Sequence, residues 1–156
     1  MKINNYSVML NENRVPYLKL DNSVEYQVES ELNNSALIVK MVNNIFDLEY
    51  CAEEHLITIA MDTKWHVLGV FQTSHGEIAA TEASARCILQ RALLCGAATF
   101  IVVHNHPSGD CTPSQEDIKA AERLKEAGAL MQIPMSDFII VGNGNYFSYF
   151  EMRNIA

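Results

Sequence analysis

Residues 99–109 are Thr-Phe-Ile-Val-Val-His-Asn-His-Pro-Ser-Gly, a short apolar run that leads directly into two histidines. The first five of these residues are mostly β-branched or aromatic and precede a Pro/Gly loop, which predicts a strand buried on both faces. Because side chains alternate along an extended chain, His104 and His106 should point the same way at the end of this strand. Two imidazoles at this spacing can bind one metal ion.

A third candidate ligand, Asp117, lies on the helix predicted to follow the loop, with Ser114 as its expected N-cap. Asp117 begins an i, i+3, i+4, i+7 stripe that is otherwise alanine and leucine, so its carboxylate should lie on the packed face. An unpaired carboxylate there is costly, and a metal ion bound by His104 and His106 would compensate for it. The alternative is that Asp117 only closes a capping box with Ser114, because Ser-x-x-Asp resembles that signature.

The spacing of these residues resembles a known metal-binding signature. The series His104-x-His106, Ser114 and Asp117 is similar to the JAMM motif of the JAB/MPN+ metallopeptidase family, and residues 104–110 resemble its RadC branch. The resemblance covers most of the chain. It implies an α/β fold in which a mixed β-sheet is flanked by helices, the JAB/MPN (cytidine-deaminase-like) architecture.

The same resemblance implies a role for each residue of the motif. His104, His106 and Asp117 would bind one Zn²⁺ ion and leave a position for water, which is the pattern of catalytic rather than structural zinc. Ser114 would donate a hydrogen bond to the oxyanion of a tetrahedral intermediate, in addition to capping the helix.

The general base implied by the resemblance is a glutamate upstream of the histidines. In RadC relatives it lies eight residues before an aspartate that ends a buried strand, and counting back from Asp62 gives Glu54. Glu53 is the competing choice, and its side chain should face the other side of the strand.

Other residues near the motif are expected to have smaller roles. Asp110 and Ser108 should brace the loop through hydrogen bonds, and Cys111 is interpreted as incidental. RadC relatives commonly have Asp-His after the last helix, where this chain has Asp137-Phe138. The role of that histidine in relatives therefore has no direct counterpart here.

Composition limits the class of protein. The chain has 156 residues, of which 49% are apolar, and this suits a globular domain with a sizeable core. The net charge of −8 disfavours non-specific binding to nucleic acid and leaves only a local basic patch as a route to duplex DNA. Four cysteines without a Cys-x-x-Cys pair, no secretory signal and no bilayer-length apolar run lead us to expect a cytoplasmic protein without a membrane partner.

The chain is expected to divide at residue 34. Residues 1–34 should form a strand-rich extension of the same domain, either a ribbon at the sheet edge or an arm that docks on a partner or substrate, and residues 35–156 the JAB/MPN+ RadC-like metal-binding domain. Ser35 and Thr81 are the expected N-caps of the first two helices. The expected helices cover 35–50, 81–95 and 114–130, and the expected strands cover 6–10, 17–20, 24–28, 56–61, 65–71, 99–103, 135–141 and 146–150.

The expected function is that of a zinc-dependent hydrolase, a metallopeptidase or isopeptidase that cleaves an amide bond in a peptide or protein-conjugate substrate. In this hypothesis Glu54 activates the water bound to the metal. The alternative is a DNA-repair or mobile-element accessory protein of the RadC type without peptidase activity, although nothing in the chain resembles the helix-hairpin-helix domain that RadC-type proteins often carry. A non-catalytic interaction module is a third hypothesis, and a zinc deaminase is disfavoured because no Pro-Cys-x-x-Cys follows the histidines. A second copy of the chain, in a homodimer, is among the expected partners.

Overall fold

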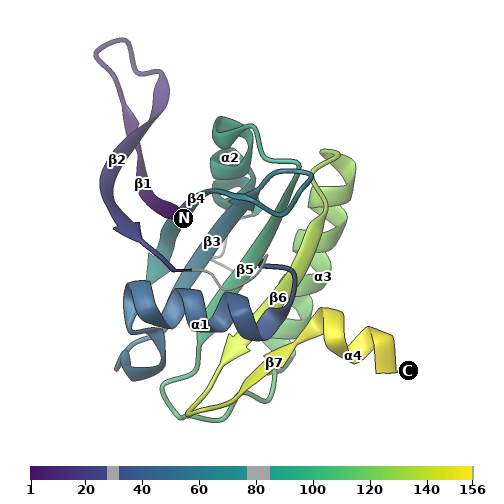
Figure 1. Cartoon of the computed structure of the whole chain (residues 1–156). Helices are drawn as coiled ribbons and strands as arrows, with labels where there is room; N and C mark the ends of the chain where they lie inside the picture. Colours follow the sequence, from purple (N-terminus) through teal and green to yellow (C-terminus); the bar gives the residue numbers. More distant parts are fainter. Residues whose placement is uncertain (28–31, 77–84, 156) are drawn as a thin grey trace.

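The computed structural model describes residues 1–27, 32–76 and 85–155, and its centre is a mixed sheet of seven strands in the order β2-β1-β4-β3-β5-β6-β7 (Figure 1). The strands are β1 (Lys2–Leu10), β2 (Pro16–Glu25), β3 (His55–Met61), β4 (Val67–His75), β5 (Thr99–Asn105), β6 (Met135–Val141) and β7 (Tyr146–Ser148). The helices are α1 (Ser35–Phe46), the 3₁₀ helix η1 (Leu48–Tyr50), α2 (Ala85–Cys95), α3 (Gln115–Leu130) and α4 (Tyr149–Ile155). The expected fold class, a mixed sheet flanked by helices, is confirmed. No helix among the described residues combines the length and apolar character needed to cross a membrane.

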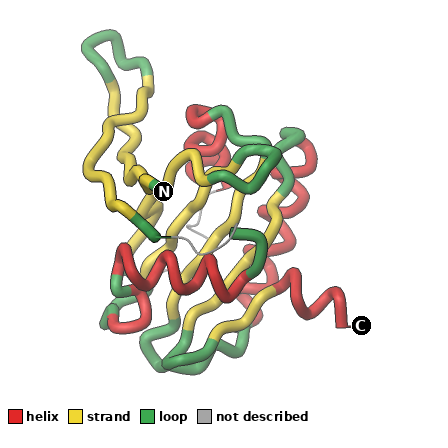
Figure 2. Tube along the Cα trace, in the orientation of Figure 1, coloured by secondary structure: helices red, strands yellow, loops and turns green. Residues whose placement is uncertain are grey.

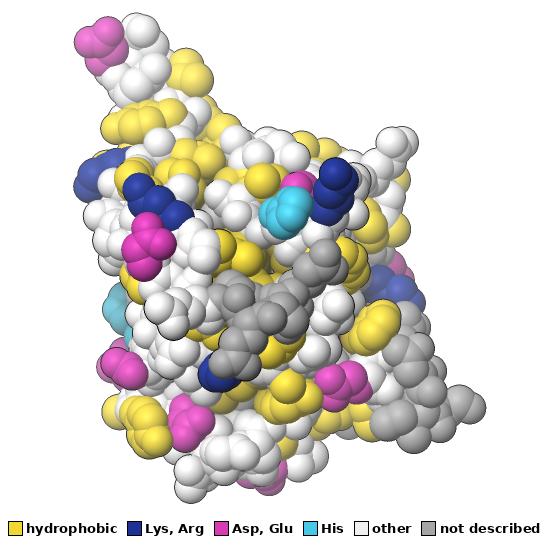
Figure 3. Space-filling model, in the orientation of Figure 1, with side chains coloured by type: hydrophobic (Ala, Val, Ile, Leu, Met, Phe, Trp, Pro, Cys, Tyr) yellow, Lys and Arg dark blue, Asp and Glu magenta, His cyan; other side chains and the backbone are white. Residues whose placement is uncertain are grey.

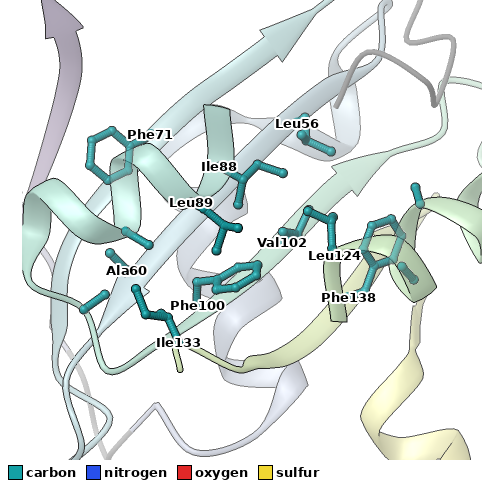
Figure 4. Packing of buried hydrophobic residues seen from close by; sticks show 14 of the residues in the cluster. Leu56, Ala60, Phe71, Ile88, Leu89, Phe100, Val102, Leu124, Ile133 and Phe138 are labelled. Carbon is teal, nitrogen blue, oxygen red and sulfur yellow. The ribbon is translucent and has the colours of Figure 1, made fainter. Parts of the chain in front are cut away.

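Helices cover both faces of the sheet. Figure 2 shows α1 lying across one face, while α2 and α3 lie on the other. In β5, Phe100 and Val102 belong to a core shared with α2 and α3, which we call the α2/α3 core (Figure 4). Ile101 and Val103 belong to a second core shared with α1, the α1 core. The prediction that this strand is buried on both faces is confirmed, and each large apolar side chain buried there contributes roughly 1.5–3 kcal/mol.

The position of β5 determines where the loop after it lies. It pairs antiparallel with β3 on one side and parallel with β6 on the other. The chain passes from β5 through α3 to β6, which is a parallel crossover of the βαβ type. Such a connection brings the carboxyl end of the first strand close to the N-terminus of the helix, and the two histidines and Asp117 occupy those two ends.

The first helix begins at Ser35 as expected, but its N-cap is the preceding residue. Asn34 is its N-cap, since the Asn34 side chain accepts a hydrogen bond from the backbone N–H of Leu37. The prediction of Ser35 as cap is wrong: the Ser35 side chain is buried and its hydroxyl donates to Oδ2 of Asp137. The helix also ends early, at Phe46, because Asp47 adopts a left-handed conformation before η1. Thr81, the cap expected for the second helix, lies outside the described residues.

The bounds of two other strands also need correction. Residues 24–28 were expected to form a separate strand, but Val24 and Glu25 end the continuous strand β2, and residue 28 lies outside the described residues. The strand expected to end at residue 71 continues as β4 to His75, which pairs with His55 of β3. Both differences arise from pairing with a neighbouring strand, which local sequence does not encode.

Only the first part of the strand expected at 146–150 is a strand. β7 ends at Ser148, and the chain continues as helix α4. The buried carboxylate of Asp137 accepts hydrogen bonds from the Ser35 and Ser148 hydroxyls and from the backbone N–H of Phe150. This carboxylate satisfies a donor at the start of α4 and thereby favours the change from strand to helix.

The strands β1 and β2 form a ribbon that extends beyond the rest of the sheet (Figure 1). It joins the sheet through β4, with which β1 pairs at Asn5 and Val70. Figure 3 shows apolar side chains along this ribbon, and its exposed large apolar residues are Met9, Leu10, Val15, Tyr17 and Leu20. The ribbon is attached at the sheet edge, while the division of the chain at residue 34 stays a prediction.

Replacing Gly128 with alanine tests how closely α3 packs. A Cβ atom at Gly128 would lie 2.7 Å from the carbonyl oxygen of Ile133 and 3.0 Å from the ring of Phe100. Glycine to alanine inside a helix normally stabilises by about 1 kcal/mol, but overpacking against backbone costs roughly 1–3 kcal/mol. The two effects sum to a net loss of about 0–2 kcal/mol, so we expect Gly128→Ala to lower the free energy of unfolding by roughly 1 kcal/mol in urea titrations.

The control is Glu126→Ala on the exposed side of the same helix. This change should alter the free energy of unfolding by less than about 0.5 kcal/mol. A Gly128→Ala protein as stable as the wild type would show that the helix and the Ile133 backbone are not in close contact.

Cys95 should be alkylated more slowly than the exposed Cys87. The Cys95 side chain packs against the α2/α3 core, and burial raises the pKa of its thiol to about 11. Only the thiolate reacts, so roughly one part in a thousand is reactive at pH 8. Timed labelling with iodoacetamide, read by mass spectrometry, should modify Cys87 well before Cys95. Equal rates in the folded protein would contradict the burial, and in guanidinium chloride the two rates should converge.

Candidate metal centre

The candidate site lies where β5 ends and α3 begins. His104 is near the end of β5, and His106 follows the strand directly. The backbone N–H of His106 donates to the carbonyl of Val141, so the extended conformation continues one residue beyond β5. Asp117 is in the first turn of α3. The structure brings together one possible ligand atom from each of His104, His106 and Asp117, all within 4.8 Å of one another.

The carboxylate of Asp117 faces both imidazole rings. Its Oδ1 lies 3.3 Å from Nε2 of His104, and its Oδ2 lies 3.3 Å from Nε2 of His106. The two rings are in an edge-to-face arrangement with centroids 5.0 Å apart. Two nitrogens and a carboxylate therefore converge on one small volume.

Asp117 is held in place by Ser114. The backbone N–H of Asp117 donates to Oγ of Ser114, and the backbone N–H of Ser114 donates to Oδ2 of Asp117, which completes a capping box. Burial raises the pKa of the Asp117 carboxyl, but hydrogen bonds from His106 and Ser114 and the nearby His104 hold this pKa well below its usual value. The Asp117 carboxylate therefore caps the helix and faces the histidines at the same time, although the sequence analysis treated capping and metal binding as alternatives.

His104 has the environment of a neutral ligand. Its side chain is buried, and burial lowers the pKa of its imidazole to about 4 although Asp117 acts in the opposite direction. The imidazole is therefore neutral at pH 7. Within the described residues its buried Nε2 has no hydrogen-bond partner, because the contact with Asp117 lacks hydrogen-bond geometry. A buried nitrogen without a partner is destabilising, and a bound cation would satisfy it.

His106 leads to the same conclusion by another route. Its Nδ1 lies 2.7 Å from the carbonyl oxygen of Asp110, so Nδ1 carries the proton and Nε2 is the free nitrogen of the neutral ring. That nitrogen would then turn a lone pair toward the carboxylate of Asp117, which is favourable only if a proton or a metal ion lies between them. In the protonated ring Nε2 would donate to Asp117, and this interaction raises the pKa of His106 against the effect of burial, so positive charge is favoured between the two side chains. The three residues thus fit a metal ion.

The loop between the ligands is braced by its own side chains. The hydroxyl oxygen of Ser108 accepts the backbone N–H of Asp110, and Oδ1 of Asp110 accepts the backbone N–H of Thr112. These are contacts of the kind expected for Ser108 and Asp110. Cys111 is half-buried, and its thiol is free.

Glu54 lies close to His106 and Asp117, whose charges act on its carboxyl. The last pair of the β3–β5 ladder is Leu56 with His104, and Glu54 precedes β3 by one residue. Burial raises the pKa of the half-buried Glu54 carboxyl, while His106 lowers it. Glu53 is exposed. The structure therefore places Glu54, rather than Glu53, beside the candidate metal centre.

The Ser114 hydroxyl has a partner in this structure. It is 2.6 Å from Oδ2 of Asp117 and accepts the backbone N–H of Asp117. The structure thus accounts for Ser114 as the cap of α3, and its oxyanion role stays a prediction.

The sequence analysis did not predict the aromatic side chains that pack against His104. The ring of Phe138 lies 5.3 Å from the ring of His104, and Tyr149 packs edge-on against Phe138. Burial raises the pKa of the Tyr149 hydroxyl to about 12, with smaller contributions from Asp117 and Glu122. The available signal was Phe138 itself, an apolar residue at a position where the resemblance leads to the expectation of a histidine.

Comparison with known proteins identifies the family. The model of the RadC-like JAB domain matches residues 32–155, so the chain belongs to this family. The chain is 41% identical to a UPF0758 protein of Pelobacter propionicus over 106 residues, which cover 68% of this chain and 46% of that protein. It is 35% identical to a UPF0758 protein of Methanococcoides burtonii over 123 residues, which cover 76% of this chain and 54% of that protein. The chain spans about half the length of these curated relatives. The predicted resemblance is confirmed.

Metal analysis tests the site directly. We expect the purified protein to bind one zinc ion per chain in elemental analysis, because both free Nε2 atoms and the carboxylate converge. His104→Ala should weaken zinc binding by more than about 100-fold, since it removes a ligand rather than a residue that supports one.

The matched control is His66→Ala, which changes an exposed histidine paired with Asp62. It should leave the zinc stoichiometry and affinity unchanged. A His104→Ala protein that binds zinc as tightly as the wild type would refute the assignment of these ligands.

Proposed function

We propose that the protein is a zinc-dependent hydrolase that cleaves an amide bond in a peptide or protein conjugate, as a metallopeptidase or isopeptidase. The observation that carries the proposal is the convergence of three ligand candidates, His104, His106 and Asp117, with Glu54 near enough for His106 and Asp117 to act on its carboxyl. Membership of the RadC-like JAB family supports it. The RadC-type accessory function without peptidase activity is compatible with the same fold, and the experiment below distinguishes the two.

In this proposal the metal site and the base have separate tasks. His104, His106 and Asp117 would hold Zn²⁺, which polarises a scissile carbonyl and lowers the pKa of water. Ser114 keeps Asp117 oriented through the capping box, so the ligand is held in place by the helix start.

Glu54 is the proposed general base. It accepts a proton from the attacking water and delivers it to the nitrogen of the leaving amine, so that one carboxylate acts first as base and then as acid. Its half-buried position beside His106 shields part of the carboxyl from bulk solvent. Ser114 is proposed to donate to the oxyanion when its hydroxyl turns from Asp117, a contribution of roughly 3 kcal/mol in comparable sites.

Glu54→Gln tests the proposal. The change preserves size and hydrogen bonding but removes the base, so turnover should fall by roughly 10²–10⁴-fold while zinc stoichiometry is unchanged. The assay is hydrolysis of a panel of peptides and ubiquitin-like conjugates by the zinc-loaded protein, with zinc measured on the same samples.

Glu53→Gln is the matched control, because Glu53 is the exposed neighbour. It should retain wild-type turnover. Equal activity of Glu54→Gln and the wild type would refute the role of Glu54. A zinc-loaded wild type that cleaves no member of the panel but binds duplex DNA in a salt-sensitive way would favour the accessory function.

A further inference from the structure

Asn105 lies between the two histidines, and its side chain points away from both. Along β5 the side chains alternate, so Asn105 shares the face of Ile101 and Val103 rather than that of His104. Only 1% of Asn105 is exposed. A buried side-chain amide needs hydrogen-bond partners, and the partners of Asn105 indicate its role.

All three hydrogen bonds of this amide go to one short stretch of backbone. Oδ1 accepts the N–H of His55 at 2.8 Å. Nδ2 donates to the carbonyl of Glu53 at 3.0 Å and to the carbonyl of Cys51 at 3.3 Å. Both amide hydrogens are therefore used, and the contacts lie on either side of Glu54 along the chain.

This stretch has little other structure to hold it. Pairing between β3 and β5 ends at Leu56 and His104, and residues 51–54 precede β3 without belonging to a helix or strand. The carbonyl of Glu54 accepts the N–H of Gly76, which anchors the peptide from the side of β4. Backbone pairing between β3 and β5 stops at Leu56 and His104. Beyond that point, the side-chain amide of Asn105 makes the hydrogen bonds to the backbone of residues 51–55.

We propose that Asn105 is a positioning residue for Glu54. Its amide fixes the backbone on both sides of Glu54, so that the Glu54 carboxylate faces His106 and Asp117. The inference rests on the proposed function, because it takes Glu54 to be the base. Only a side chain with an acceptor and two hydrogens on one donor reproduces these contacts: aspartate lacks the donors, and leucine of similar shape lacks both.

The test uses Asn105→Leu in the zinc-loaded full chain. We call the three hydrogen bonds from the Asn105 side chain to residues 51–55 the clamp. If the clamp holds this backbone, the amide of His55 should exchange with solvent at least tenfold faster in the variant, as measured by hydrogen exchange and mass spectrometry across residues 51–55. It also predicts that kcat falls by about 10–100-fold while KM changes less than about threefold, since a small displacement of a catalytic group costs rate rather than binding. Zinc stoichiometry should not change.

Ser35→Ala is the matched control. The Ser35 hydroxyl is also buried and bonded to Asp137 and Ser148, but it lies at the start of α1. This variant should lower stability without changing exchange at residues 51–55 or kcat. A fall in kcat in Ser35→Ala equal to that in Asn105→Leu would reduce the effect to general destabilisation and overturn the positioning role.

Two readouts separate this inference from the proposed function. Unchanged exchange at residues 51–55 in Asn105→Leu, or a rapidly exchanging His55 amide in the wild type, would overturn the clamp. The wild-type measurement decides this even if the variant does not fold. Faster exchange with unchanged kcat would overturn the positioning role while Glu54→Gln still tests the base. If the wild type has no hydrolase activity, the proposed function fails and the positioning role fails with it, although the exchange data still report the clamp.

Discussion

A carboxylate on the packed face of α3 lies against two imidazoles in the protein interior, and the arrangement of the other elements around the site depends on this contact. A buried charge is stable only when its surroundings compensate for it, because its loss of hydration is large. Three groups can compensate for the charge of Asp117: the positive end of the α3 dipole, the backbone N–H and hydroxyl of Ser114, and the histidine rings when they share a proton or a metal ion with the carboxylate. The first two belong to the helix. The third is supplied by β5, so the strand and helix must end next to each other.

The sheet topology supplies that proximity. A parallel crossover from β5 through α3 to β6 brings the strand end and the helix start to one edge of the sheet. The close approach of α3 at Gly128 to the Ile133 backbone holds the far end of the helix near β6. β3 pairs antiparallel with β5, and Glu54, the residue before β3, lies near His106 and Asp117. Three segments therefore meet at one site because of a single central strand.

Local sequence was sufficient for the parts of this arrangement that are encoded locally. The apolar run before His104, the alternation of the two histidines and the stripe led by Asp117 each depend on residues a few positions apart. Their outcome in the structure follows from strand and helix periodicity. The family was recognisable for the same reason, since its motif lies within a short stretch of chain.

The features that sequence did not reveal depend on contacts between distant segments. Asn34 and Ser35 are both good caps, and only the burial of Ser35 against Asp137 decides between them. β4 runs to His75 because β3 is there to pair with it. Likewise, Asn105 has no local partner, and its role appears only when residues 51–55 lie beside the end of β5.

The two faces of β5 carry different groups of the site. The pairing register of the strand must therefore be fixed to a single residue. His104 and His106 lie on the face toward α3, whereas Asn105 lies on the face toward α1 and grips the backbone that carries Glu54. A shift of one residue would exchange these faces, turning the amide toward Asp117 and both imidazoles into the α1 core. The apolar residues from Phe100 to Val103 oppose such a shift, because they alternate between the α2/α3 core and the α1 core. Packing on both sides of the strand is thus the reason that a ligand pair and a backbone clamp can occupy adjacent positions in the chain.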